Sequence, residues 1–284
     1  MVKLHTVQEL VRLSTAYLQD KGCQSPRLDA EVLMAHVLNT DRVHLYMNFD
    51  RPLENDEVDA YRRLIGLRGR RVPVAYLTGR KEFYGRDFVV NEAVLIPRPE
   101  TEILVDQALT LLQSKPEPQV LDIGTGSGVI AITLALQFKD ARVIAVDISK
   151  EALELAELNA DRLHAADRLS FLQSDMFSQV PAQAFDLICS NPPYIPSDNL
   201  EDLEQEVMRE PKQALDGGRD GLDYYRILIE HAPNYLKAGG YLLVEIGWDQ
   251  AGQILALAQR RGFGDCQVVQ DYAGKDRVVI MKWQ

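Results

Sequence analysis

Apolar residues follow a helical spacing over the first part of the chain. From residue 1 to about 70 they recur every three or four positions, which is the pattern of amphipathic helices. The first stripe consists of Val7, Leu10, Val11, Ser14, Tyr17 and Leu18. Gly22 ends this helix, and a second helix begins at Ser25-Pro26 and runs to Leu38. Two shorter helices are expected near 41–48 and 54–70, so the sequence predicts a small helical domain.

The pattern changes to strand-forming residues between Glu82 and Pro97. Gly85 and Asn91 interrupt these residues, which predicts a β-hairpin that connects two domains. A helix from about 100 to 113 follows, with prolines on either side of it.

After Gln119, short apolar runs alternate with helical segments. This alternation predicts a parallel sheet with helices on both faces. Strands are expected at 119–123, 142–147, 169–173, 185–190, 240–246, 267–270 and 276–282. Helices are expected near 127–138, 149–162, 222–236 and 249–260. The turn at Tyr272-Ala273-Gly274-Lys275 is too short for the crossover of a parallel pair, so the final strand should run antiparallel.

These elements predict an α/β protein with three parts. Residues 1–80 form the helical domain, 81–99 a β-hairpin linker and 100–284 a Rossmann-like domain with a seven-stranded sheet. The segment 195–221, rich in acidic residues and glycine, matches no regular element. It follows the candidate site directly, and we expect a loop that faces the substrate.

Composition narrows the classes of partner. Hydrophobic residues make up 46% and charged residues 26% of the chain, as in a folded globular protein. The net charge of −11 opposes extended contact with nucleic acid, which depends on Lys and Arg. A basic cluster at 62–86 is interpreted as solvated helix faces.

The sequence contains neither a run of eighteen apolar residues nor an apolar leader. We therefore expect no membrane association and a cytoplasmic location. We also expect no metal and a monomer.

A glycine-rich turn follows the first strand of the predicted sheet. The strand 119–123 leads into Gly124-Thr125-Gly126-Ser127-Gly128 and then a helix, an arrangement in which the backbone can approach a ligand closely. Both gaps between the glycines are two residues, whereas a dinucleotide fingerprint has gaps of two and three. The turn therefore favours a nucleoside-bearing cofactor other than NAD or FAD.

The next two strands supply further candidate cofactor contacts. Asp147 ends the second strand, where its carboxylate could accept hydrogen bonds from both ribose hydroxyls. The third strand delivers Ser174-Asp175-Met176-Phe177 to the same edge. There a carboxylate could accept from an adenine amino group while Met176 covers the ring, although Met176 could equally be core packing.

The fourth strand ends in Asn191-Pro192-Pro193-Tyr194. Two prolines fix the backbone and remove two N–H donors, which leaves carbonyl groups available to a ligand. The Asn191 side-chain oxygen and the Pro192 carbonyl could accept both hydrogens of one NH2 group, while Tyr194 contacts a flat conjugated group. This geometry suits methyl transfer to a delocalised nitrogen through alignment, and it leaves open whether an amide or a nucleobase carries that nitrogen.

At these residues the sequence resembles the class I methyltransferases. Over nearly its whole length it is similar to the release factor glutamine methyltransferases of the HemK (PrmC) type. Besides Asp122 to Gly128 and Asn191 to Tyr194, the resemblance includes Pro73 to Gly79, Glu82-Phe83-Tyr84-Gly85 and Ile96-Pro97-Arg98-Pro99-Glu100-Thr101-Glu102.

The resemblance implies a seven-stranded methyltransferase sheet and S-adenosylmethionine as the cofactor. By the same resemblance the helical domain docks the substrate, which is the glutamine of the Gly-Gly-Gln loop in a class I peptide-chain release factor. Gly124, Thr125, Gly126, Ser127, Gly128, Asp147, Met176 and Asn191 are then the cofactor residues. Asn191 to Tyr194 hold the glutamine amide, with Asn191, Pro192 and Tyr194 catalytic. Arg98 is expected to steady either the acidic loop or the cofactor carboxylate. An amino methyltransferase for adenine or cytosine is the alternative function.

Overall fold

The computed structural model describes residues 5–284, so the first four positions of the predicted helical domain lie outside it. The chain divides into two compact units. The first contains the residues up to Arg80 together with Glu204–Arg209, and the second contains Lys81–Leu203 and Glu210–Gln284. Among the described residues, no helix combines the length and apolarity needed to cross a membrane.

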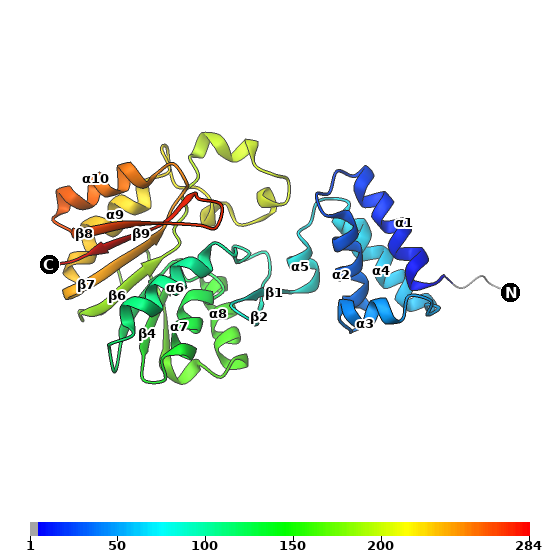
Figure 1. The fold of residues 1–284 in the computed structure, drawn as a ribbon, viewed down its shortest axis with the longest axis horizontal. Helices are drawn as coiled ribbons and strands as arrows, with labels where there is room; N and C mark the ends of the chain where they lie inside the picture. The colour runs from blue at the N-terminus through cyan, green and yellow to red at the C-terminus, as the bar shows by residue number, and fades with distance from the viewer. Residues whose placement is uncertain (1–4) are drawn as a thin grey trace. The chain divides into compact units, whose positions relative to one another are not determined.

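The first unit is a bundle of helices (Figure 1). They are α1 (Val7–Asp20), α2 (Pro26–Val37), α3 (Arg42–Met47), α4 (Asn55–Arg68) and α5 (Val74–Thr78). The Thr6 side chain caps α1 by accepting from the Glu9 backbone N–H at 3.2 Å, and a proline begins α2. The core includes Leu33 and Tyr61, and the Tyr61 hydroxyl donates to the Ala30 carbonyl at 3.1 Å. Of the predicted first stripe, Tyr17 is 40% exposed, and the other members are buried: Val7, Leu10, Val11, Ser14 and Leu18.

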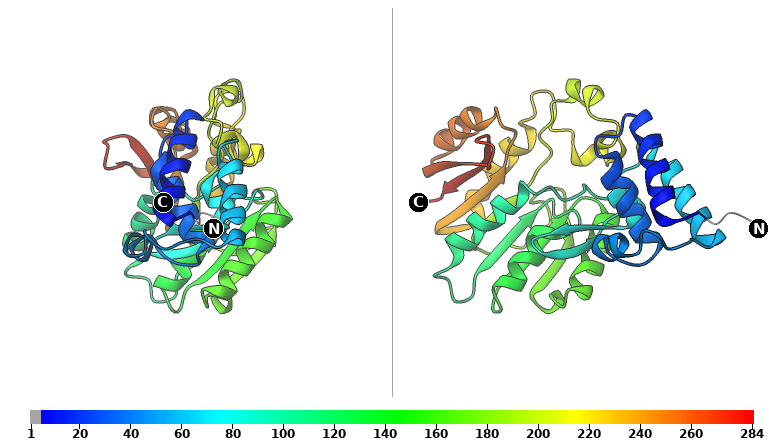
Figure 2. Two further views of the ribbon diagram at one scale, coloured as in Figure 1. Left: turned by 90° about the vertical axis from the view of Figure 1, so that its right-hand side faces the viewer. Right: turned by 45° about the vertical axis from the view of Figure 1, so that its right-hand side comes forward.

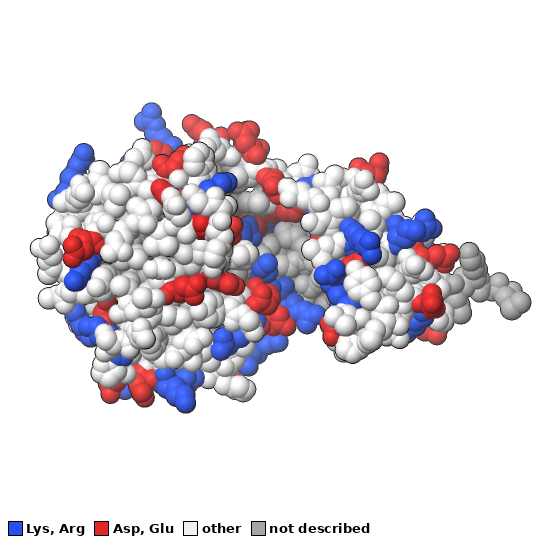
Figure 3. All heavy atoms as spheres, in the orientation of Figure 1, with Lys and Arg blue, Asp and Glu red and all other residues white. Residues whose placement is uncertain are grey.

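Ion pairs hold Glu204–Arg209 in the first unit. Arg68, only 5% exposed, pairs with Asp29 at 2.7 Å and with Glu206 at 2.8 Å, and Arg71 also pairs with Glu206. Two members of the basic cluster are therefore neutralised within this unit. Figure 3 shows acidic and basic side chains intermingled on the visible surface. Arg68 and Arg71 are therefore held in ion pairs, whereas the sequence analysis interpreted the cluster as solvated helix faces.

The second unit contains the seven-stranded sheet. Its strands are β3 (Gln119–Ile123), β4 (Arg142–Asp147), β5 (Leu169–Gln173), β6 (Phe185–Ser190), β7 (Leu236–Glu245), β8 (Gly264–Gln270) and β9 (Asp276–Lys282). They lie in the order β5-β4-β3-β6-β7-β9-β8. The pairs from β5 to β7 are parallel, and β9 runs antiparallel to both β7 and β8. The predicted antiparallel last strand is confirmed.

Helices cover both faces of this sheet (Figures 1 and 2). They are α6 (Thr101–Leu112), α7 (Val129–Gln137), α8 (Lys150–Arg162), α9 (Asp223–His231) and α10 (Ala251–Arg261). Alternate strand residues belong to separate cores: Val120 packs with α6 and α7, and Leu121 packs with α9 and α10. Strands buried on both faces explain the continuous apolar runs of the sequence.

The hairpin, predicted as a linker, consists of β1 (Arg80–Phe83) and β2 (Arg86–Val89), and from Lys81 onward it belongs to the second unit. Phe83 and Phe88 are buried in the core of this unit. The Asn159 side chain of α8 accepts from the Val89 N–H at 2.7 Å and donates to the Val89 and Ser127 carbonyls. One buried amide therefore joins the hairpin to the glycine-rich turn.

The segment 195–221 is ordered by short 3-10 helices and polar contacts. The helices are Ser197–Asp202, Val207–Arg209 and Lys212–Ala214. Glu210, 6% exposed, accepts from the Ile96 N–H at 2.9 Å and from the Arg98 guanidinium. Arg98 therefore contacts the acidic loop, as one of its two predicted roles requires, and it also lines the pocket at the candidate site.

Candidate functional site

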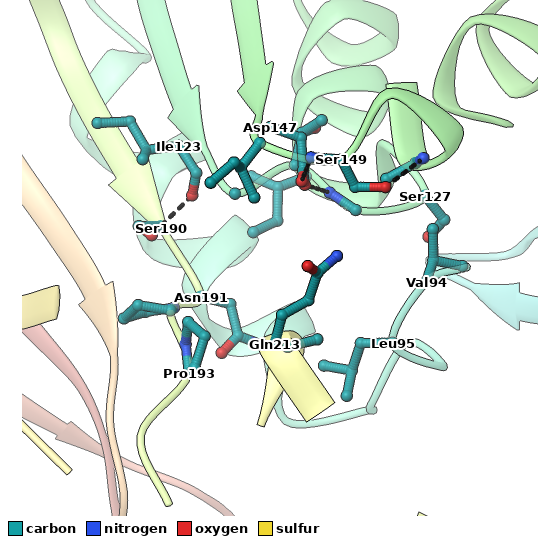
Figure 4. A pocket seen from close by; sticks show the side chains of 18 of the residues that line it. Val94, Leu95, Ile123, Ser127, Asp147, Ser149, Ser190, Asn191, Pro193 and Gln213 are labelled. Carbon is teal, nitrogen blue, oxygen red and sulfur yellow. Dashed lines mark hydrogen bonds between the residues drawn. The ribbon is translucent and has the colours of Figure 1, made fainter. Parts of the chain in front are cut away.

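A pocket lies at the carboxyl edge of the sheet, where β3, β4 and β6 end (Figure 4). These neighbouring strands are parallel, so the segments that follow them meet at one edge. Of the predicted residues, the lining contains Gly124, Thr125, Gly126, Ser127, Asp147, Met176, Asn191, Pro192 and Pro193. Gly128 and Tyr194 are not among the lining residues. Most of the predicted site is therefore brought together in one cavity.

The glycines of the turn differ in their surroundings. Gly124 and Gly126 have φ of +73° and +55°, and a Cβ at either position would meet no atom within 4 Å. Their backbone is therefore open toward the pocket. At Gly128 a Cβ would lie 2.7 Å from the Ile132 side chain and 3.2 Å from Ala156. A side chain at Gly128 would therefore crowd α7 and α8, and Gly128, which the sequence suggested as a cofactor contact, is not among the residues that line the pocket.

Asp147 fixes the turn from the end of β4. Its Oδ2 accepts from the Gly126 N–H at 2.9 Å, and its Oδ1 accepts from the Ser149 N–H at 3.0 Å. Burial raises the pKa of this carboxyl above its ordinary value, against the effect of these backbone donors. Asp147 lines the pocket, and its carboxylate has further lone pairs with which it can accept from a ligand hydroxyl.

Asp122 supports the same turn from behind. It is fully buried and accepts from the Thr125 hydroxyl at 2.7 Å. Burial raises the pKa of Asp122 to about 6. Because Asp122 does not line the pocket, its contribution is to hold Thr125 in place.

Two apolar side chains border the same part of the pocket. Ile148 follows Asp147 and is 54% exposed, which is unusual for an isoleucine beside a buried strand. Met176, after β5, also lines the pocket and packs against the second core. Together they offer apolar surface to a flat ring. Met176 was predicted from the sequence as a cofactor residue, whereas Ile148 was not.

Asn191 is oriented by a residue that the sequence analysis did not select. Its Nδ2 donates to the Thr101 hydroxyl oxygen at 3.2 Å, which leaves Oδ1 as the atom able to accept from a ligand. Figure 4 shows Asn191, Pro193 and Gln213 around the cavity. Gln213 comes from the loop 195–221 and lines the pocket, in agreement with the expected position of that loop.

Tyr194 lies outside the lining and packs against the second core. Burial raises its pKa to about 12. The Gln250 side chain donates to the Tyr194 carbonyl at 3.0 Å and to the Gly221 carbonyl at 3.2 Å. Gln250 therefore ties the end of the tetrapeptide to the end of the loop 195–221. No spacing in the sequence pointed to this contact.

Other lining residues were also missed. Val94 and Leu95 line the pocket after the hairpin, in an irregular segment that begins with a turn, where strand formers had suggested a strand. Thr101 belongs to the junction motif 96–102, which was noted without a role. Among residues 5–284, no cluster of three or more His, Cys, Asp or Glu side chains is arranged to hold a metal ion.

Comparison with solved structures identifies the fold. A methyltransferase from Pyrococcus furiosus superposes with a TM-score of 0.51 at 20% sequence identity, covering 71% of this chain and 90% of that one. At this identity the likeness concerns the fold alone. It agrees with the seven-stranded sheet and its antiparallel last strand.

Sequence comparison identifies the family. Residues 9–79 match the family described as the PrmC N-terminal domain, and residues 101–221 match the methyltransferase small domain. A release factor glutamine methyltransferase of Geobacter sulfurreducens is 46% identical over 278 residues, covering 98% of this chain and 96% of the relative. A protein of the same name from Rhodopirellula baltica is 42% identical over 284 residues, with coverage of 98% and 96%. The chain therefore belongs to the family of the release factor glutamine methyltransferases.

Proposed function

We propose that this protein transfers a methyl group from S-adenosylmethionine to the side-chain amide nitrogen of the glutamine in the Gly-Gly-Gln loop of a class I peptide-chain release factor. The observation that carries the proposal is the orientation of Asn191. Its Nδ2 is engaged by Thr101, so its Oδ1 can accept an N–H beside a pocket of nucleoside type. The names of the near full-length relatives support the same substrate.

The pocket residues fit S-adenosylmethionine. Asp147 would accept from the ribose hydroxyls, and Gly124 and Gly126 would offer open backbone to the same ligand. Ile148 and Met176, which line the same pocket, would offer apolar surface to the adenine ring. When bound, the cofactor supplies a methyl group on a positively charged sulfur. Thr125 and Ser127 complete the turn beside it.

The tetrapeptide aligns the acceptor nitrogen. The lone pair of an amide nitrogen is delocalised, so its reactivity depends on geometry. Asn191 Oδ1 and the Pro192 carbonyl would accept the two N–H groups and direct the lone pair toward the methyl group, while Pro193 lines the pocket and Tyr194 packs against the second core. Alignment of this kind contributes on the order of 7–11 kcal/mol. The methylated nitrogen becomes acidic as it forms, so a strong base is not required.

The substrate also needs a docking surface. The helical first unit is the proposed docking module for the release factor, and the protein acts as a monomer on this cytoplasmic substrate. The net charge of −11 disfavours stable nucleic-acid binding. An amine of adenine or cytosine would fit the same two acceptors, and nucleic acid is therefore included in the test.

The test is transfer of tritiated methyl from S-adenosylmethionine to a purified release factor, to the same factor with its loop glutamine changed to alanine, and to DNA and RNA. Label is expected only in the unchanged release factor. The variant Asn191→Ala should bind the cofactor but lose turnover. Label in DNA or RNA, with none in the release factor, would refute the proposed substrate.

A further inference from the structure

A chain of two hydrogen bonds runs from Asn191 into the protein interior. Asn191 Nδ2 donates to Thr101 Oγ1 at 3.2 Å, and the Thr101 hydroxyl donates to Glu245 Oε2 at 2.6 Å. Thr101 begins α6 and Glu245 ends β7, and their exposed fractions are 2% and 1%. Neither Thr101 nor Glu245 was needed to assign the proposed substrate or cofactor.

The direction of these bonds follows from the number of hydrogens. A hydroxyl has one hydrogen to donate, and a carboxylate can only accept. When Glu245 is ionised, the Thr101 hydrogen points to it, and only lone pairs of Thr101 remain for Asn191. The NH2 end of the Asn191 side chain must then face Thr101, and its oxygen faces away. The carboxylate thereby determines which end of the amide is available to the substrate.

Burial of the Glu245 carboxyl group opposes its ionisation, and several neighbouring groups act on its charge. Burial raises its pKa to about 7, although the Thr101 hydroxyl and the guanidinium groups of Arg277 and Arg98 favour the ionised form. Glu100 also acts on it and raises the pKa. The Tyr225 hydroxyl fixes the backbone carbonyl of Glu245 at 2.8 Å.

We propose that Glu245 and Thr101 are positioning residues for methyl transfer, which hold the oxygen of Asn191 toward the acceptor NH2 group. The proposal rests on the proposed role of Asn191. Protonated Glu245 can donate to Thr101, whose own hydrogen then turns to Asn191 and attracts its oxygen. Turnover should therefore fall at acid pH, because the acceptor geometry is lost while both residues stay in place.

Three variants test this chain of bonds. Thr101→Val removes the hydroxyl at nearly constant volume, Thr101→Ser retains it, and Glu245→Gln removes the ionisation. The matched control is Thr110→Val on α6, whose exposed hydroxyl donates to the backbone carbonyl of Asp106 at 2.9 Å. For each, kcat, the KM of both substrates, the melting temperature and the pH profile of kcat are measured with release factor as acceptor.

Thr101→Val should lower kcat at least about tenfold, which is the effect of about 1.4 kcal/mol in the barrier, with little change in KM for the cofactor. Thr101→Ser should restore most of kcat, and the control should match the parent. Glu245→Gln should lower kcat and abolish its decline between pH 8 and 6. Its melting temperature at pH 8 should not fall, because the variant removes the cost of burying a charge.

An unchanged kcat in Thr101→Val, or an unchanged acid decline in Glu245→Gln, would overturn the inference. An equal loss of kcat in Thr101→Val and Thr101→Ser would also overturn it. If the parent enzyme methylates a nucleic-acid amine instead, only the proposed substrate is overturned. The kcat of the same variants would then be measured with that nucleic acid as the methyl acceptor. A parent that methylates neither would overturn both.

Discussion

Replacement of Asp147 by asparagine tests the proposed cofactor site most sharply. The two carboxylate oxygens accept from two backbone donors, the N–H groups of Gly126 and Ser149, at 2.9 and 3.0 Å. They must also accept from the ribose hydroxyls in the proposed complex. Asparagine keeps the shape but has one acceptor oxygen and one NH2 donor. The variant therefore loses the charge and places an N–H group against another N–H group.

The magnitude follows from these contacts. A hydrogen bond to a charged acceptor contributes about 1.5–3 kcal/mol, and the loss of one such bond to ribose corresponds to about 10- to 150-fold weaker binding. The mismatched backbone donor disturbs the turn that borders the pocket and adds to this loss. We expect Asp147→Asn to raise the Kd for S-adenosylmethionine by a factor that lies within or above this range.

Isothermal titration calorimetry measures the Kd, with Glu154→Gln as the control. Glu154 lies on α8, the helix that follows Asp147 in the chain, and its side chain is 62% exposed and paired with Lys150, so this variant removes an equal charge away from the pocket. It should bind as the parent does. Circular dichroism melting curves establish that both variants are folded at the temperature of titration.

The pH dependence gives an independent check. Because burial raises the pKa of Asp147, a larger fraction of the carboxyl is protonated in the free protein at mildly acid pH. The cofactor should therefore bind more weakly as pH falls through that pKa, and Asp147→Asn should lack this dependence. A Kd equal to that of the parent, or an unchanged pH dependence in the variant, would refute the assigned role of Asp147.

Two further predictions concern stability. Gly128→Ala places a Cβ 2.7 Å from Ile132 at a φ of +83°, and should lower the free energy of unfolding by about 1–3 kcal/mol in urea titrations; no loss would contradict the packing role. Asp186 is buried, which opposes its ionisation, but bonds from Lys237 at 2.7 Å and Lys115 at 3.2 Å outweigh this effect and lower its pKa. Its stabilising contribution is thus present above the ordinary pKa of an aspartate and is lost as pH falls through the lowered value. Asp186→Asn should be less stable at pH 7 by about 1–3 kcal/mol and approach the parent at acid pH, and a constant difference would contradict this linkage.

The sheet could be predicted because its strands are buried on both faces. The short apolar runs at 119–123, 142–147 and 185–190 are typical of strands that are covered on both faces. The structure has strands with these bounds. The start of β7 at Leu236 was missed, since Lys237 and the glycines after it lack strand character. Helix α5 is too short to show a helical period.

The polar contacts of the site were less accessible to sequence analysis. Asn191 was found because two prolines follow it and make a rigid acceptor segment. Its partner Thr101 lies 90 residues away, and Glu245 lies 144 residues from Thr101. Such pairs depend on which strand ends meet in space. Spacing along the chain likewise could not separate Gly128, which packs against a helix, from Gly124 and Gly126, which border the pocket.

The most direct test of the account is the position of the transferred methyl group. A purified class I release factor is incubated with the protein and S-adenosylmethionine, digested, and sequenced by tandem mass spectrometry. The account predicts one added methyl group on the side chain of the glutamine in the Gly-Gly-Gln loop, absent when Asn191→Ala replaces the parent enzyme. A methyl group on another residue, or an unmodified loop under conditions where the parent binds the cofactor, would contradict it.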